Sequence, residues 1–229
     1  VLASVEARIE EALEGKGSVV WLSGEAGIGK SRLSEEIARR AGERGMSVFV
    51  SRAHEGAEAP PFWSWTHLIQ AGAVAGSALA SEEADEFARF DAFKRDLLTA
   101  CERPRLLVLD DLQWADPSSL RLLGFVARHA RDGALLLVGA YRDTALGARG
   151  SALAEVLRGG SGLAVPLRGF TVEEVSAYVE RTQGTAPSPE LAAELHAHTA
   201  GNPLYVQHAL ASDWAAKALA RTADALASS

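Results

Sequence analysis

The sequence has little cysteine, since Cys101 is the only one in 229 residues. A single cysteine excludes an internal disulfide and a zinc site built on several thiolates, and it suits a reducing compartment. Because free cysteines in proteins are mostly small buried hydrophobic residues, we interpret Cys101 as a packing residue rather than a reactive thiol.

Positive charge is also scarce, with 23 Lys and Arg against 30 Asp and Glu and a formal net charge of -7. Affinity for the phosphate backbone of nucleic acids comes mainly from clustered Lys and Arg. We therefore expect no direct nucleic-acid binding by this chain. A globular core is expected, because the hydrophobic residues make up 48% of the sequence.

Long apolar runs without polar interruption are missing as well. The longest uncharged run, 59–81, contains Pro60, Pro61, His67 and Gln70, and it does not favour a membrane span. The opening residues VLASVEARIEEALEGKG show an apolar spacing of three to four, which predicts an amphipathic helix and not a secretory signal. We expect a cytoplasmic location.

Apolar runs alternate with helical patterns through the first three quarters of the chain. The helical patterns cover 30–44 and 117–130, with Asp116 as the expected N-cap of the second. The runs expected to be strands are 19–23, 47–53, 105–111, 134–141 and a short fifth at 163–167. This alternation predicts an α/β fold with a mainly parallel five-stranded sheet between two layers of helices, a three-layer sandwich.

A glycine-rich turn follows the first expected strand. Gly24, Gly29, Lys30 and Ser31 match the pattern G-x-x-x-x-G-K-[ST] of nucleotide-binding phosphate loops. In such a loop the backbone N–H groups bind phosphate oxygens, the lysine reaches the β- and γ-phosphates, and the hydroxyl binds Mg²⁺. The alternative is an accidental match, which the strand before it and the helix after it disfavour. The expected nucleotide-binding residues here are Gly24, Glu25, Ala26, Gly27, Ile28, Gly29, Lys30 and Ser31.

Polar residues follow two other expected strands. Asp110 would hold Mg²⁺ together with Ser31, and Asp111 would orient or deprotonate an attacking water. The alternative is that both aspartates only cap the following loop. Arg142 would bind the γ-phosphate and stabilise charge in the transition state, or would instead form a surface ion pair with Asp143. Lys30, Asp111 and Arg142 are thus the candidate catalytic residues.

Five segments in this order resemble the ATPase module of signal-transduction ATPases with numerous domains (STAND proteins), an AAA-like class of P-loop ATPases. They are GEAGIGKSRL, APPFWSW, LLVLDDLQWADPSSLRLL, LLLVGAYRD and TAGNPLYVQHAL. The chain is similar in particular to the module of large ATP-binding LuxR-type transcriptional regulators and to modules attached to some adenylate cyclases and kinases.

The resemblance implies ATP or ADP with Mg²⁺ as ligands. It adds Arg32 to the phosphate loop, makes Arg142 a γ-phosphate sensor, and places Pro203 against the adenine ring. Without the resemblance, Gly201, Asn202 and Pro203 indicate only a helix-breaking turn. Such modules usually begin with a Gly-Arg-Glu-like segment that helps hold adenine, and this sequence, which starts at Val1, has no such segment before the phosphate loop.

The resemblance also implies a domain division and a role. We expect a P-loop nucleotide-binding α/β domain over 1–168 and a truncated helical lid over 169–229, where strand patterns stop. The expected partners besides nucleotide are C-terminal effector and sensor domains that this chain lacks. The sequence leaves the oligomeric state open, with a nucleotide-dependent oligomer as one option.

Our main hypothesis is an ATP-binding, slowly hydrolysing switch domain of a multidomain regulator. Slow turnover is expected because Asp111 is shorter than the glutamate that fast ATPases of the wider class often carry, and because no arginine finger stands out. The alternative is a non-hydrolysing interaction module that holds ADP as a structural ligand. A small-molecule kinase is disfavoured, since the region after Thr171 offers chiefly Arg181 and Arg221 to close on phosphates.

Aromatic and histidine residues outside these motifs have simpler interpretations. Trp63 and Trp65 are two residues apart and cannot form one stacking platform, so we expect them to pack under the edge of the sheet, with a surface for a partner as the alternative. His196, His198 and His208 lack an accompanying carboxylate or thiolate at zinc spacing, so we interpret them as solvated or core histidines.

Overall fold

The computed structural model describes residues 2–55, 59–80, 85–99, 103–146, 151–159 and 162–212. The chain divides into two units, the first made of Val1–Gly24 and Lys30–Pro166 and the second of Glu25–Gly29 and Leu167–Ser229. Each unit is described by itself below. Cys101 and Arg221 lie outside the described residues.

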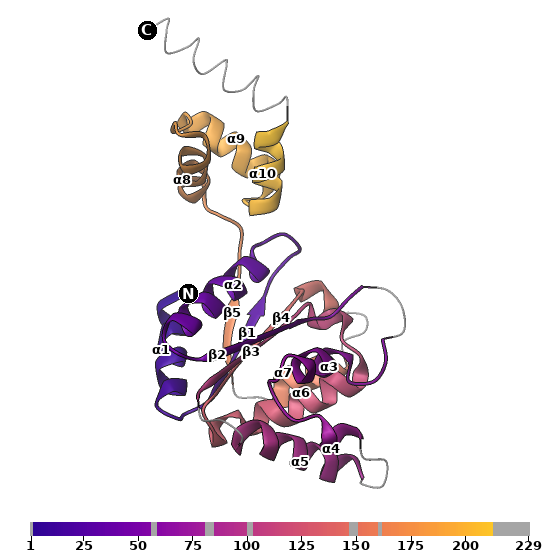
Figure 1. Ribbon diagram of the computed structural model, residues 1–229. Coiled ribbons are helices and arrows are strands. Elements are labelled where there is room, and N and C mark those ends of the chain that lie inside the picture. The colour runs from indigo at the N-terminus through magenta and orange to yellow at the C-terminus, as the bar shows by residue number, and fades with distance from the viewer. Residues whose placement is uncertain are drawn as a thin grey trace, which may run out of the picture. The chain divides into compact units, whose positions relative to one another are not determined.

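The first unit is built on a five-stranded sheet in which every strand pair is parallel (Figure 1). The strand order across the sheet is β2-β3-β4-β1-β5. The strands are β1 (Ser18–Ser23), β2 (Ser47–Arg52), β3 (Arg105–Asp110), β4 (Leu135–Tyr141) and β5 (Leu163–Pro166). All five lie where the apolar runs predicted them, with ends that differ by one residue.

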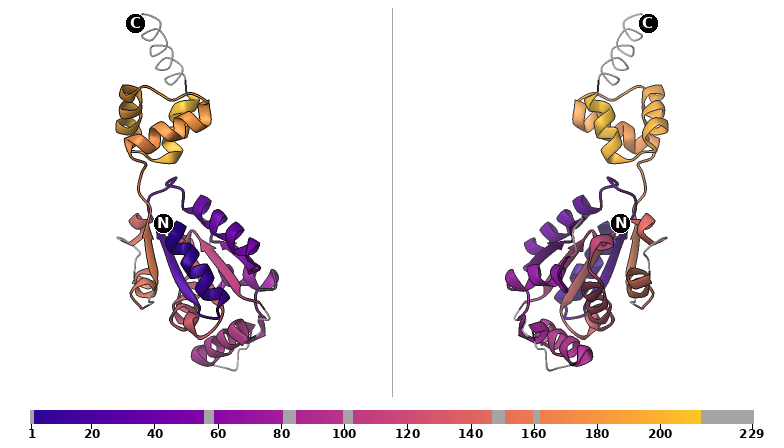
Figure 2. Two further views of the ribbon diagram at one scale, coloured as in Figure 1. Left: turned by 90° about the vertical axis from the view of Figure 1, so that its left-hand side faces the viewer. Right: turned by 90° about the vertical axis from the view of Figure 1, so that its right-hand side faces the viewer.

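Helices cover both faces of this sheet, so the predicted three-layer sandwich is confirmed (Figures 1 and 2). One face carries α1 (Leu2–Leu13) and α2 (Lys30–Glu43). The helices of the opposite layer are α3 (Trp63–Gln70), α4 (Ser77–Ala80), α5 (Glu86–Thr99), α6 (Pro117–His129) and α7 (Ser151–Gly159). Short 3₁₀ turns are η1 (Leu112–Trp114), η2 (Ala130–Asp132) and η3 (Asp143–Leu146). Because both faces are covered, β4 is buried along its whole length and consists almost entirely of apolar residues.

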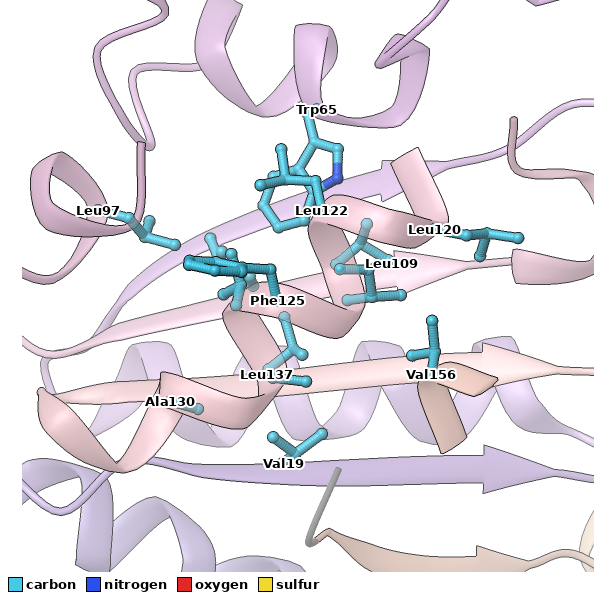
Figure 3. Close-up of a cluster of buried hydrophobic side chains, with 14 of the residues drawn as sticks. Val19, Trp65, Leu97, Leu109, Leu120, Leu122, Phe125, Ala130, Leu137 and Val156 are labelled. Carbon is cyan, nitrogen blue, oxygen red and sulfur yellow. The ribbon is translucent and has the colours of Figure 1, made fainter. Parts of the chain in front are cut away.

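The larger hydrophobic core lies between the sheet and the layer that contains α6 (Figure 3). Leu109 and Leu137 of the strands meet Leu122 and Phe125 of α6 there. Trp65 is fully buried in the same cluster, and its indole Nε1 donates to the backbone oxygen of Ser119 at 3.1 Å. The prediction that Trp65 packs inside the molecule rather than forming a partner surface is therefore confirmed.

Asp116 joins two segments that are distant in sequence. Its carboxylate accepts hydrogen bonds from the backbone N–H and hydroxyl of Ser119, at 2.9 and 2.5 Å, which confirms it as the N-cap of α6. The same carboxylate accepts from the backbone N–H groups of Phe62 and Trp63, at 3.0 and 3.2 Å. One buried acidic side chain thus fixes the start of α3 against the start of α6.

The second unit contains α8 (Val172–Gln183), α9 (Pro189–Thr199) and α10 (Pro203–Ala211). Its small core consists of Val175, Val179, Leu191, Leu195 and Val206. The helices predicted after Thr171 are confirmed over 172–211. In the part of the chain that the structure describes, no group of three His, Cys, Asp or Glu side chains could hold a metal ion. Nor does any helix there have the length and apolar character that crossing a membrane requires.

Candidate functional site

The topology brings three predicted positions to one edge of the sheet. β4 lies between β1 and β3, and all three strands run in the same direction. Their carboxyl ends therefore meet at one edge, where Gly24 follows β1, Asp110 ends β3 and Arg142 follows β4. Ligands of open parallel sheets gather at such an edge.

The glycine turn after β1 has the backbone conformation that only glycine adopts readily. Gly24, Gly27 and Gly29 have φ angles of 146°, 75° and 105°. Helix α2 starts at Lys30, directly after the last of these glycines. The predicted order of strand, glycine turn and helix is therefore present, with the N–H groups of the first turn of α2 beside the loop.

Lys30 is buried and its ammonium folds back onto the loop. Its Nζ donates to the backbone oxygen of Gly24 at 2.9 Å. Burial and, next, the nearby charge of Arg142 lower the pKa of Lys30, while the carboxylates of Asp111 and Asp110 act in the opposite direction. The charged form of Lys30 is disfavoured in the free protein, and a bound anion would stabilise that form. The surroundings of Lys30 therefore suit an anionic ligand.

Ser31 and Asp110 lie in contact across the site. The Ser31 hydroxyl donates to Oδ2 of Asp110 at 2.7 Å, and the backbone N–H of Asp111 donates to Oδ1 at 2.9 Å. Asp110 is 3% exposed. A hydroxyl and a carboxylate are the hard oxygen donors that Mg²⁺ accepts when phosphate and water oxygens supply its other ligands. These two residues therefore fit a magnesium site.

A positively charged side chain also reaches the Asp110 carboxylate. Arg52, the last residue of β2, donates to Oδ2 of Asp110 from Nη2 at 3.0 Å and from Nε at 3.3 Å. Its Nε also lies 3.9 Å from Oδ2 of Asp111. The sequence analysis missed Arg52; the available signal was its place at the end of a strand that precedes a charged loop.

Asp111 stands in the left-handed region, with φ 58° and ψ 41°, which is uncommon for a residue other than glycine. Its Oδ1 accepts from Nε2 of Gln113 at 2.7 Å. The amide oxygen of Gln113 in turn accepts from the backbone N–H of Arg142 at 3.2 Å. Gln113 therefore connects the candidate base to the end of β4, and it is the second residue that the sequence analysis missed.

Arg142 is half-buried, and its charge acts on Lys30 as described above. Within the described ranges, no ion pair joins it to Asp143, the partner that the alternative interpretation required. Arg32 instead points to solvent, where its side chain is 87% exposed and pairs with Glu35 at 3.4 Å.

The turn predicted at Gly201, Asn202 and Pro203 lies in the second unit. Asn202 caps α10 by accepting from the backbone N–H of Leu204 at 3.1 Å, and Pro203 is the first residue of that helix. Within the same unit, Nδ2 of Asn202 donates to the backbone oxygen of Ala26 at 2.9 Å. Asn202 was predicted only as part of the motif, and this hydrogen bond to the glycine turn was not predicted.

Comparison with known families gives a match to the AAA ATPase domain over residues 1–138. An uncharacterized protein of Rhizobium meliloti (strain 1021) is 30% identical over 173 residues. That alignment covers 58% of this chain and 17% of the relative, so the chain spans about one sixth of the relative's length.

Solved structures share the fold at low sequence identity. An ORC2 protein of Aeropyrum pernix in its ADP form is 17% identical with a TM-score of 0.56, over 98% of this chain and 63% of that chain. A STAND protein of Pyrococcus horikoshii with a tetratricopeptide repeat sensor is 17% identical with a TM-score of 0.54, over 88% and 28%. A RuvB variant of Thermotoga maritima is 19% identical with a TM-score of 0.52, over 90% and 58%.

Proposed function

Because this chain belongs to the AAA ATPase domain family, we propose that it binds ATP with Mg²⁺ at the carboxyl edge of its sheet and hydrolyses it slowly as a molecular switch. The observation that carries the proposal is the contact of Ser31 with Asp110 at 2.7 Å, beside a buried Lys30 at the start of α2. Lys30 and the two hard oxygen donors, Ser31 and Asp110, thus lie at the carboxyl edge of the sheet, where α2 starts.

Each residue has a proposed part in binding. The backbone N–H groups of the glycine turn and of the first turn of α2 bind phosphate oxygens. Lys30 moves its ammonium from the Gly24 carbonyl to the β- and γ-phosphates. Ser31 and Asp110 hold Mg²⁺, which, when bound, neutralises charge on the phosphates. The resemblance to STAND modules supports a contact of Pro203 with the adenine base.

Hydrolysis is proposed to depend on Asp111. Its carboxylate would orient a water molecule and accept its proton, held in place by the 2.7 Å hydrogen bond from Gln113. Slow rather than fast turnover is proposed because Asp111 is shorter than the glutamate that fast ATPases of the wider class often carry.

Arg142 is proposed to distinguish ATP from ADP. It follows β4 directly, and its backbone N–H is connected through Gln113 to Asp111. A guanidinium at this edge can bind a γ-phosphate that ADP lacks, and only such a differential contact can shift a conformational equilibrium. The switch is proposed to act on sensor and effector domains of a larger regulator, a role supported by the resemblance alone.

A second function has one observation in its favour. Asp111 is already engaged by Gln113 and lies near Arg52, so the candidate base is bound by protein groups in this structure. Such a site would suit a module that holds ADP as a structural ligand without hydrolysis. The two functions predict different results for the wild type: the switch releases phosphate slowly, whereas the ADP-holding module releases a negligible amount.

Phosphate release and nucleotide content together test the proposal. Mass spectrometry of the purified chain would identify any retained nucleotide, and calorimetry would measure ATP binding with Mg²⁺. We expect wild type to release phosphate slowly and Asp111→Asn to release less while it still binds ATP. Equal, negligible release by both proteins, with ATP or ADP bound, would support the ADP-holding module. Absence of any nucleotide binding would refute both.

A further inference from the structure

Arg52 and Asp110 are opposite one another in the sheet. In the parallel pairing of β2 with β3 these two residues are register partners, each the last residue of its strand. The backbone therefore holds the two side chains at the same level of the carboxyl edge. The ion pair between them, with donors at 3.0 and 3.3 Å, is a consequence of strand register rather than of a flexible loop.

The carboxylate of Asp110 has all its hydrogen-bonding needs met by protein groups. Oδ2 accepts from Ser31 and from two nitrogens of Arg52, and Oδ1 accepts from the backbone N–H of Asp111. A buried carboxylate without such partners would be strongly disfavoured. The guanidinium of Arg52 supplies positive charge in hydrogen-bond contact with Asp110, and the ammonium of Lys30, which donates to the backbone oxygen of Gly24, also acts electrostatically on this carboxylate.

We propose that Arg52 is an internal counter-cation, which compensates the Asp110 carboxylate in the metal-free protein and must release Oδ2 before that oxygen can serve a divalent cation. The inference rests on the proposed function, because it takes Asp110 as the metal-binding carboxylate. Two positive charges cannot share one carboxylate oxygen at contact distance without mutual repulsion. Arg52 thereby lowers the affinity of the empty site for a divalent cation and favours metal binding together with the phosphates of a nucleotide.

The exposure of the two side chains fits this assignment. The Arg52 side chain is 53% exposed, whereas that of Asp110 is 4% exposed. The arginine can therefore turn toward solvent or toward Asp111 at little cost, while the carboxylate stays in place. Because the guanidinium of Arg52 is half-exposed, water can solvate it after release, so its release is an accessible event rather than a large rearrangement.

The test compares Arg52→Gln with a matched arginine in the same unit. Arg39 on α2 forms ion pairs with Glu36 at 2.7 Å and Glu43 at 2.5 Å, so Arg39→Gln also removes one paired positive charge. Binding of Mn²⁺ to the nucleotide-free 229-residue chain is followed by the electron paramagnetic resonance signal of free Mn²⁺. We expect Arg52→Gln to bind Mn²⁺ about fivefold more tightly than wild type, and Arg39→Gln to match wild type.

Two further variants assign the effect to the carboxylate and guard against misfolding. Adding Asp110→Asn to Arg52→Gln is expected to abolish the gain in Mn²⁺ affinity. Arg52→Lys keeps the charge but loses the paired donors of the guanidinium, so its Mn²⁺ affinity is expected to lie between those of wild type and Arg52→Gln. This variant decides the question if Arg52→Gln does not fold.

Three outcomes would overturn the assignment. One is that Arg52→Gln binds Mn²⁺ no more tightly than wild type does, or that neither wild type nor Arg52→Gln binds Mn²⁺ detectably. Another is an equal gain in Arg39→Gln, which would show a general effect of net charge. The third is a large loss of ATP affinity by Arg52→Gln in EDTA, which would make Arg52 a phosphate ligand. If wild type binds no ATP in any buffer, the proposed function fails, and the Mn²⁺ comparison still decides the role of Arg52.

Discussion

The hydroxyl of Ser31 lies 2.7 Å from a carboxylate oxygen of Asp110, although 79 positions separate the two residues in the sequence. Ser31 is placed by the start of α2 and Asp110 by the end of β3. The contact depends on the strand order that puts β4 alone between β1 and β3. A single hydrogen bond therefore connects the phosphate-loop motif to the acidic strand end.

Removing the Ser31 hydroxyl should affect the metal more than the nucleotide. Ser31→Ala removes one donor to Asp110 and one proposed oxygen ligand of Mg²⁺. We expect the gain in ATP affinity that Mg²⁺ provides to fall about tenfold, since groups that orient metal ligands typically have effects of this size. ATP binding in EDTA should change little. Calorimetric titrations with Mg²⁺ and with EDTA measure the two quantities.

Ser34 provides the control on the same helix. Ser34 is buried whereas Ser31 is half-buried, and the Ser34 hydroxyl has no hydrogen-bond partner. Ser34→Ala should leave the effect of Mg²⁺ on ATP affinity at the wild-type value and should not lower the free energy of unfolding. If both alanine variants changed the Mg²⁺ effect equally, the assignment of Ser31 to the metal would be wrong.

The lowered pKa of Lys30 predicts a pH dependence of ATP affinity. The free protein loses this proton below the pH at which an exposed lysine, with a pKa of 10.5, would lose it. Bound phosphates favour the charged form, so the pKa of Lys30 rises in the complex. Between these two pKa values ATP affinity should fall with rising pH, by at most about tenfold per pH unit. Titrations from neutral to alkaline pH measure it.

Lys30→Met is the reference for this pH series. Loss of the buried ammonium should weaken ATP binding by on the order of a hundredfold at neutral pH, and the remaining affinity should not show the alkaline decrease. A variant that kept wild-type ATP affinity would contradict the role of this lysine.

The lowered pKa of Lys30 also affects folding, because stability should increase with rising pH where ATP affinity decreases. Charged Lys30 disfavours the native state at neutral pH, and this cost decreases as pH rises from the folded-state pKa to the unfolded value of 10.5, so Lys30→Met should not lower the melting temperature.

Asp116 is expected to be among the most sensitive polar residues for stability. Asp116→Ala would leave the backbone N–H groups of Phe62 and Trp63 without their acceptor and remove the cap of α6. We expect the free energy of unfolding to fall by about 2–4 kcal/mol. Urea denaturation measures it.

Asp85 is the matched control, because it accepts from the backbone N–H of Ala88 at 2.7 Å on the exposed surface. Asp85→Ala should cost about 1 kcal/mol or less. An equal loss in both variants would mean that the connection from Asp116 to the start of α3 contributes nothing beyond ordinary capping.

The sequence predicts those parts of the molecule whose signal is local. β3 and β4 are apolar runs of Leu and Val that suit a strand covered on both faces. The phosphate turn is defined by residue types at fixed spacing, and the N-cap of α6 by Asp-Pro. For these elements, propensity, pattern and turn chemistry agree, so no knowledge of neighbours is required.

The missed residues have signals that are not local. Arg52 is significant only because β2 pairs with β3 in the register that sets it opposite Asp110. Strand order in a parallel sheet is decided by the crossovers, and residue patterns within the strands do not specify it. Gln113 required the left-handed conformation of Asp111, which turns the chain so that the amide can reach both Asp111 and the end of β4.

Gln113 should affect turnover and not binding. Gln113→Leu removes the donor that holds Asp111 and the acceptor for the backbone N–H of Arg142, yet it removes no proposed ligand of nucleotide or metal. A base misplaced by a small distance loses much of its effect. We therefore expect kcat for phosphate release to fall about tenfold to a hundredfold, with KM for ATP within about twofold of wild type.

Gln183→Leu, an exposed glutamine at the end of α8, should change neither constant. A rise in KM for Gln113→Leu without a change in kcat would assign this glutamine to nucleotide binding. If Gln113→Leu kept the kcat of wild type, the backbone conformation of Asp111 alone would be sufficient to position its carboxylate. A selective fall in kcat would be expected only if the amide acts by positioning the carboxylate, because a general loss of stability would affect binding and turnover together.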